Sequence, residues 1–162
     1  MEYEDSSSKF SQDAKTISVV GIVSAGHGVA SGKAQDSPFG KGTIALQSPF
    51  FEELGIPMNQ FFSATINVDI SPLSFDLPNW DYEALQLRWT DVIPPEDFYF
   101  SHCKITHLSR THDALIYRPS PATKVDHFQK CSIIEILAPK LDKLKYGDTV
   151  KLLLNADHCS VT

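Results

Sequence analysis

Along most of this chain, apolar residues either alternate with polar residues or stand in short blocks. Both arrangements favour β-strands over long helices. Turn-forming residues separate the blocks, and we expect turns near His112 and Asp113 and at 146–148. The segments that we expect to be strands are 16–24, 42–47, 61–70, 83–90, 98–107, 114–117, 131–138 and 149–154.

Helices are expected to be few and short. One is predicted at 48–55, where Ser48 can cap the helix, Pro49 suits its first position and Gly55 can end it. A further helical turn is expected at 139–144. Many short strands with one or two short helices indicate an all-β (mainly β) barrel or sandwich of six or seven strands. A barrel is favoured because several strands carry consecutive apolar residues, so that both of their faces are covered.

The first residues of the chain differ in composition from the rest. Residues 1–15 are polar and acidic, which predicts a mobile tail, and 16–162 is expected to form a single domain. The tail lacks the basic start and apolar stretch of a secretory signal, and no apolar run is long enough to span a bilayer. The expected location is therefore the cytoplasm.

The net charge limits the expected binding partners, and the cysteine content bears on disulfide bonds. The chain has 14 Lys and Arg against 20 Asp and Glu, a net charge of −6. We expect no nucleic-acid partner, because phosphate backbones require clustered Lys and Arg, and no membrane partner. A local pocket for a small phosphate ligand is still allowed. Three widely spaced cysteines, an odd number, do not form a disulfide framework: Cys103, Cys131 and Cys159.

The predicted strand at 61–70 carries the most informative chemistry. Its alternation places Thr65 and Asn67 on one face, and Ile66 and Val68 on the other. A hydroxyl and an amide then lie roughly 6–7 Å apart between Cα atoms. Both are neutral oxygen donors, which suit a hard cation such as Mg²⁺ that also carries phosphate oxygens and water. The alternative is that both side chains cap a bulge or face solvent.

A glycine-rich loop at 24–33 follows directly on the first predicted strand. Its glycines, Gly26 and Gly28 on either side of His27, allow a ligand to approach the backbone closely. Successive N–H groups in such a turn form a concave anion site. The spacing fits neither the dinucleotide fingerprint nor the Walker loop. The alternative is a flexible hairpin loop.

Taken together, these segments resemble a known family, the archaeal CTP-dependent riboflavin kinases, which have the Greek-key cradle-loop barrel fold. The resemblance extends over about 19–154, and the middle of the chain is longer than in the archaeal enzymes. The segment 64–68 resembles the family's Gly-Thr-Leu-Asn-Leu magnesium motif, with Ala64 in place of the glycine. The other matching segments are 21–28, 133–139 and 146–150.

The resemblance implies a specific set of ligands. Thr65 and Asn67 would bind Mg²⁺, and Thr123 and Ser132 would lie at the flavin. Ser132 stands where the family has an acidic residue. The nucleotide, CTP or another NTP, would be the phosphoryl donor to riboflavin, giving FMN. The residues implied to bind it are Ser24, Gly26, His27 and Gly28 at the phosphates, and Ile136, Leu137, Ala138 and Pro139 at the base.

Phosphoryl transfer to a hydroxyl requires alignment and charge neutralisation more than covalent help. Two residues are candidates for the general base, Glu135 and His27. Glu135 shares a strand face with Ile133 and Leu137, so it must be paired if it is buried. Lys33 or Lys41 could add a positive charge near the phosphates.

Two other functions are open at this stage. A metal enzyme could use the scattered histidines and Cys103, but on one strand Cys103 and His107 are roughly 13 Å apart, too far to share a Zn²⁺ ion. A non-catalytic module could bind a nucleotide or flavin in the same pocket, because fold does not fix function. The histidines in question are His102, His107, His112 and His127.

Overall fold

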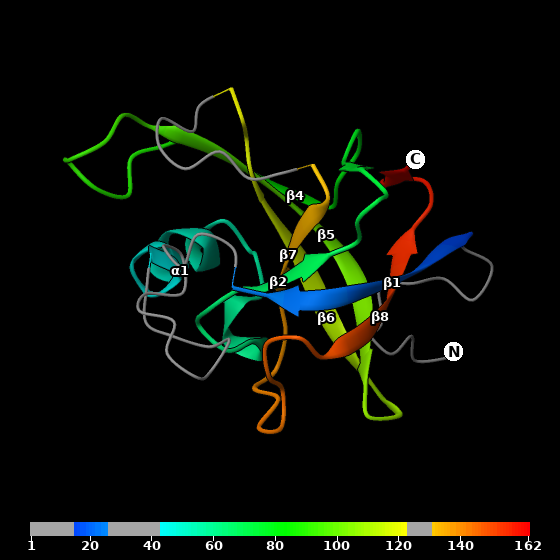
Figure 1. Ribbon diagram of the computed structural model, residues 1–162. Helices are drawn as coiled ribbons and strands as arrows, with labels where there is room; N and C mark the ends of the chain where they lie inside the picture. The colour runs from blue at the N-terminus through cyan, green and yellow to red at the C-terminus, as the bar shows by residue number, and fades with distance from the viewer. Residues whose placement is uncertain (1–14, 26–42, 123–130) are drawn as a thin grey trace, which may run out of the picture.

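β-Strands make up most of the regular structure of this chain. A computed structural model describes residues 15–25, 43–122 and 131–162, and Figure 1 shows their arrangement. The elements in chain order are β1 (Thr16–Ser24), α1 (Thr43–Glu53), the 3₁₀ turn η1 (Met58–Gln60), β2 (Ile66–Asp69), β3 (Phe75–Asp76), β4 (Tyr82–Leu87), β5 (Glu96–His107), β6 (Arg110–Pro119), β7 (Ile133–Leu137), β8 (Thr149–Asn155) and β9 (Ser160–Val161).

Seven of these strands form one antiparallel sheet in the order β4-β5-β6-β7-β2-β1-β8, and β3 pairs with β9 separately. Strand β8 also pairs with β5, from Cys103 opposite Leu154 to Thr106 opposite Lys151. The sheet therefore curls and partly closes into a ring. The prediction of a mainly-β chain with a short helix is confirmed. No helix in the described ranges is long and apolar enough to cross a bilayer.

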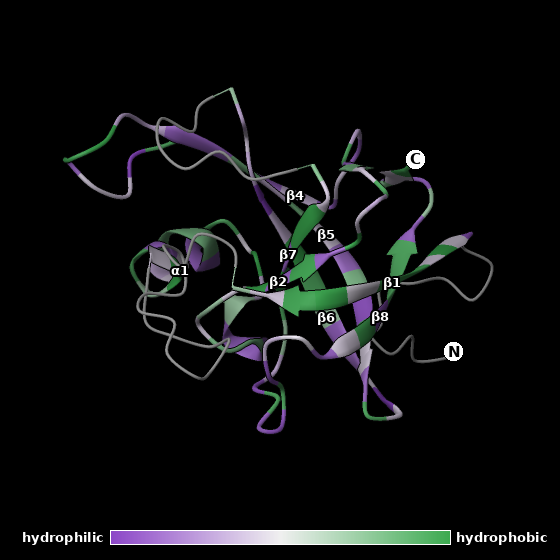
Figure 2. Ribbon diagram, viewed as in Figure 1, coloured by the Kyte–Doolittle hydropathy of each residue, from purple (hydrophilic) through white to green (hydrophobic). Residues whose placement is uncertain are grey.

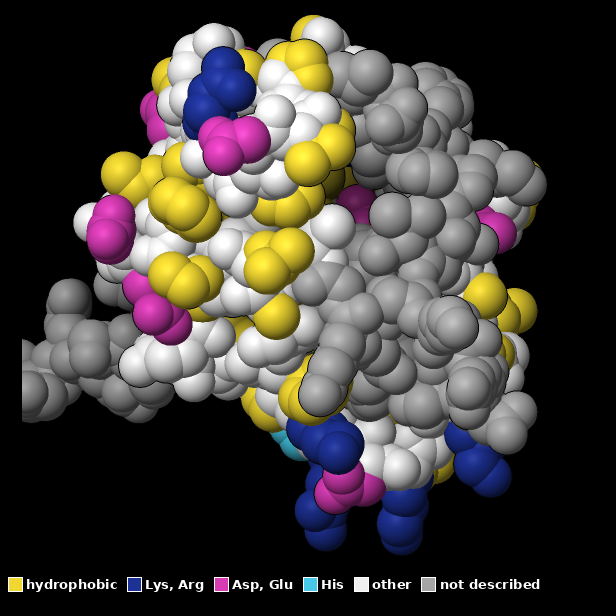
Figure 3. All heavy atoms as spheres, turned by 90° about the vertical axis from the view of Figure 1, so that its left-hand side faces the viewer, with side chains coloured by type: hydrophobic (Ala, Val, Ile, Leu, Met, Phe, Trp, Pro, Cys, Tyr) yellow, Lys and Arg dark blue, Asp and Glu magenta, His cyan; other side chains and the backbone are white. Residues whose placement is uncertain are grey.

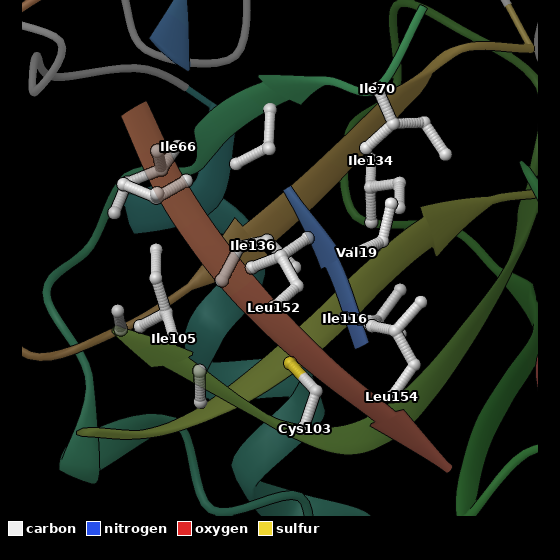
Figure 4. Packing of buried hydrophobic residues seen from close by; sticks show 14 of the residues in the cluster. Val19, Ile66, Ile70, Cys103, Ile105, Ile116, Ile134, Ile136, Leu152 and Leu154 are labelled. Atoms are coloured by element: carbon white, nitrogen blue, oxygen red, sulfur yellow. The ribbon is translucent and has the colours of Figure 1, made fainter. Parts of the chain in front are cut away.

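The main hydrophobic core fills the inside of the curled sheet. On β1, Val19 and Val23 are buried whereas Val20 and Ile22 are 60% and 50% exposed, as a strand with one core-facing side requires. Figure 2 shows the apolar character of β1, β2 and β7. The side chains that point inward in Figure 4 include Val19, Ile66, Ile70, Cys103, Ile105, Ile116, Ile134, Ile136, Leu152 and Leu154.

A second hydrophobic cluster lies on the outer face of the sheet, where α1 covers it. Ile44 and Phe51 of the helix are fully buried there. The Phe51 ring makes edge contacts with Phe98 and Phe100, at centroid distances of 5.1 and 5.0 Å. Leu137 of β7 belongs to this cluster, so neighbouring residues of β7 serve different cores.

The structure corrects the prediction of a strand at 42–47. Residues 43–47 begin α1, and Pro49 lies inside the helix instead of at its first position. The buried residues Ile44, Gln47 and Phe51 are spaced three and four apart, which is the helical period. The exposed Leu46, which is 62% exposed, hides that period in the sequence.

Two further expectations differ from the structure, and two of its short strands were not predicted. The turn between β5 and β6 lies at Leu108 and Ser109, not near His112 and Asp113. Both turn residues have positive φ, 50° and 64°. This conformation usually selects Asn and Gly, so Leu and Ser do not mark a turn at this position. Residues 139–144 form turns without a helix, and the short strands β3 and β9 were not predicted.

Candidate functional site

A row of polar side chains crosses three neighbouring strands on the outer face of the sheet. Ser24 of β1 stands opposite Asn67 of β2, and Asn67 stands opposite Glu135 of β7. Residues directly opposite on paired strands point to the same face, with Cβ atoms about 4.5–5.5 Å apart. Their sequence neighbours Val23, Val68 and Ile136 point into the main core. We call Ser24, Asn67, Glu135 and the adjacent Thr65 the polar row.

Thr65, just before β2, joins the row through a hydrogen bond. Its hydroxyl donates to Glu135 Oε1 over 3.5 Å, and the Asn67 amide Nδ2 donates to the Ala25 carbonyl over 3.5 Å. Thr65, Asn67 and Glu135 are 1%, 7% and 7% exposed. The prediction that Thr65 and Asn67 share a face, opposite Ile66 and Val68, is confirmed.

The hydroxyl of Ser24 is the least satisfied group of the row. Its Oγ atom is buried and has no hydrogen-bond partner among the described residues. Leaving such a group without a partner costs on the order of 1–3 kcal/mol, and sites of this kind often mark the place of a ligand, ion or water. An oxygen donor at this end of the row extends the set of potential ligands from β2 to β1.

Glu135 is buried beside the hydrophobic cluster that α1 covers. Tyr117 of β6 lies near it, and burial raises the pKa of the Tyr117 hydroxyl well above its ordinary value, with the negative charges of Glu135 and Glu96 adding to the rise. That hydroxyl donates to Gln47 Oε1 of α1 over 2.9 Å. The carboxylate thus lies at the edge of the cluster that α1 covers, where charge is only weakly screened.

The other predicted nucleotide contacts are placed differently. The side chains of Ile136 and Ala138 lie in the main core and that of Leu137 in the cluster beneath α1. Only the backbone of this segment and the partly exposed Pro139 can meet a base from outside. Gly26, His27, Gly28 and Thr123, like Lys33 and Lys41, lie outside the described residues. Ser132 is partly exposed, and its carbonyl accepts a hydrogen bond from Ile70 N over 2.8 Å.

The structure does not assemble the alternative zinc site. The ring of His102 bonds to the Tyr82 hydroxyl at 2.9 Å, whereas Cys103 is buried in the main core and His107 pairs with Asp148. Within the described ranges, no three His, Cys, Asp or Glu residues come together as a metal site; His127 lies outside these ranges.

What sequence reasoning missed is the register. Ser24 and Glu135 were predicted for separate roles, and their common row with Asn67 depends on how β1, β2 and β7 pair. No protein-family model and no curated protein matches this chain. The polar row and the sequence resemblance are therefore the features that point to a function.

Proposed function

We propose that this chain is a Mg²⁺-dependent phosphotransferase, with a riboflavin kinase-like cradle-loop barrel, that transfers a phosphoryl group from CTP or another NTP to riboflavin. The observation that carries the proposal is the buried polar row, in which Thr65, Asn67 and Glu135 lie together on one face of the sheet. The identity of the nucleotide and of the acceptor comes from the resemblance of 64–68 and 133–139 to the archaeal kinases.

The residues of the row fit a magnesium ion. Mg²⁺ prefers hard oxygen ligands and usually keeps several waters and substrate phosphates in its octahedral shell. Thr65, Asn67 and Ser24, whose Oγ has no partner among the described residues, offer neutral oxygens, and Glu135 adds a carboxylate within reach of Thr65. Bound there, Mg²⁺ would neutralise charge on the phosphate oxygens.

Glu135 is the candidate general base. In the proposed reaction, the bond between the γ-phosphorus and the bridging oxygen breaks, and its electron pair leaves with the nucleoside diphosphate. A new bond forms from the γ-phosphorus to the primary hydroxyl oxygen of riboflavin, and the hydroxyl proton passes to Glu135. Thr65 donates to the same carboxylate, so it orients Glu135 while its own oxygen lone pairs stay available. His27, the other candidate base, lies in the part of the chain that is not described.

The direct test is an assay for product. Purified protein is incubated with riboflavin, Mg²⁺ and either CTP or ATP, and FMN is separated by chromatography. The proposal predicts FMN that depends on Mg²⁺. Binding of nucleotide or flavin without FMN would favour the non-catalytic module, and the absence of both binding and product would refute the proposal.

The variant Asn67→Ala tests the site itself. Loss of one ligand to the ion should reduce turnover by about 100-fold or more, with an unchanged circular dichroism spectrum. Asn79→Ala is the matched control, because the Asn79 side chain is exposed and its amide donates to the Asp157 carbonyl, away from the polar row. Equal turnover in the two variants would place the metal site elsewhere.

A further inference from the structure

A hollow of about 450 Å³ lies at the end of the sheet where β5 turns into β6. The strand ends His107 and Arg110 form one wall, and the segment 140–143 forms the other. A volume of this size suits a small organic ligand. The hollow is separate from the polar row, because no residue of the row lines it.

The lining of this hollow is strongly basic in an acidic chain. Arg110, Lys140 and Lys143 line it, together with the imidazoles of His107 and His112. The net charge of the whole chain is −6, so the composition alone would not predict a cluster of cations here. Figure 3 shows Lys and Arg side chains gathered at the lower end of the molecule.

The three cations of the hollow form no ion pair with another residue in the part of the chain that the structure describes. The four ion pairs between described residues involve none of Arg110, Lys140 and Lys143. The ammonium of Lys140 lies over the Phe62 ring, 5.4 Å from its centroid, an arrangement that positions the charge without cancelling it. Asp142 is the one acidic residue in the lining among the described residues.

Hydrogen bonds to Asp148 hold one wall of the hollow in place. His107 Nε2 donates to Asp148 Oδ2 over 2.9 Å, and the same carboxylate oxygen accepts the Lys145 backbone N–H over 3.0 Å. This joins the end of β5 to the loop that precedes β8. At the rim, Leu108 and Ser109 form the two-residue turn between β5 and β6, with the positive φ at both positions that such a turn requires.

We propose that this hollow binds the phosphate group of a small phosphomonoester. Arg110 and the two lysines would donate charge-assisted hydrogen bonds to a phosphate dianion. A carboxylate has fewer oxygens and less charge, so it would form fewer of these bonds. Leu108, which is 64% exposed, and the buried Leu141 form an apolar wall for the organic part of the ligand. This inference does not depend on the proposed kinase activity.

The test is an NMR titration of the ¹⁵N-labelled full chain with glucose 6-phosphate in the absence of Mg²⁺, with acetate at equal ionic strength as the comparison. We expect saturable shifts of the amides of Leu108, Arg110 and Lys143, with Kd of about 1 mM or tighter. Acetate should leave these amides almost unchanged. Shifts that do not saturate, or that acetate reproduces, would overturn the proposal.

Variants locate the binding. The double variant Arg110→Gln/Lys143→Gln should weaken binding by about tenfold or more, because it removes two charge-assisted hydrogen bonds to the phosphate. Arg88→Gln is the matched control, since Arg88 is exposed beyond the end of β4 and is absent from the lining. Asn67→Ala should bind glucose 6-phosphate as the unmodified chain does, which separates this site from the polar row. Unchanged affinity in the double variant would refute the assignment.

Discussion

At the scale of single residues, the candidate site consists of polar side chains at buried positions of the sheet. Such positions are more often occupied by apolar residues. The face shared by Thr65 and Asn67 was predictable, because the two-residue period of a strand fixes it. The contributions of Ser24 and Glu135 were not, because strand register is set by pairing between distant segments. A period can be read from one segment, whereas a register needs two.

Gly21 is a residue-scale requirement of the fold. A Cβ atom at this position would lie 2.5 Å from Val68 Cγ1 and 2.9 Å from the Asp69 carbonyl oxygen. Gly21→Ala should therefore force β1 away from β2 and lower the free energy of unfolding by about 1–3 kcal/mol. Urea denaturation measures the change. Ser18→Ala, at an exposed position of the same strand, should stay within about 0.5 kcal/mol; equal losses would show that the close approach is not limiting.

Asp148 should make the free energy of unfolding depend on pH in the acidic range. Hydrogen bonds from the Lys145 backbone N–H and from His107 hold the pKa of this carboxyl below its ordinary value of 3.8. A depressed pKa in the folded state stabilises the fold above the unfolded pKa, and this stabilisation is lost as the pH falls through the folded value. Unfolding midpoints measured from pH 6 down to pH 2.5 should therefore fall more steeply for the unmodified chain than for Asp148→Asn. Parallel curves would contradict this assignment.

At the scale of elements, α1 shows why local sequence was an incomplete guide. Its propensity is weak, and Pro49 lies in its interior, where proline removes a backbone hydrogen bond. The helix is stabilised instead by tertiary contacts, chiefly Phe51 among Phe98 and Phe100 and the Tyr117 hydroxyl bond to Gln47. Contacts of this kind are long-range, so the sequence-based boundaries placed the helix too late. The strands with clear alternation, such as β1 and β8, were predicted to within a residue.

The adjacent phenylalanines of α1 provide a matched test of whether tertiary contacts of Phe51 stabilise this helix. Phe51 is fully buried, whereas Phe50 is 38% exposed. Phe51→Ala should lower the free energy of unfolding by about 3–5 kcal/mol, because it removes a large core side chain and leaves a cavity. Phe50→Ala should cost markedly less. Thermal denaturation of the two variants measures the difference, and similar losses would show that the helix is not anchored through Phe51.

At the scale of the whole molecule, the pairing of β8 with β5 brings distant strand ends to one end of the curled sheet. The end of β1 carries Ser24, the start of β2 follows Thr65, and the ends of β5 and β7 lie beside the 139–148 segment. One end of the sheet thus holds both the polar row and the basic hollow. The overall class was predictable from the number of short strands, whereas this convergence follows from topology.

NMR with a paramagnetic ion can show where a divalent cation binds to this chain. Mn²⁺ takes the same oxygen ligands as Mg²⁺, and its unpaired electrons broaden the NMR signals of nearby amides. With CTP present, trace Mn²⁺ should broaden the amides of Ser24, Thr65, Asn67 and Glu135 first, and excess Mg²⁺ should restore them. Broadening that begins at another place in the chain, or that Asn67→Ala leaves unchanged, would contradict the assignment of the polar row as the metal site.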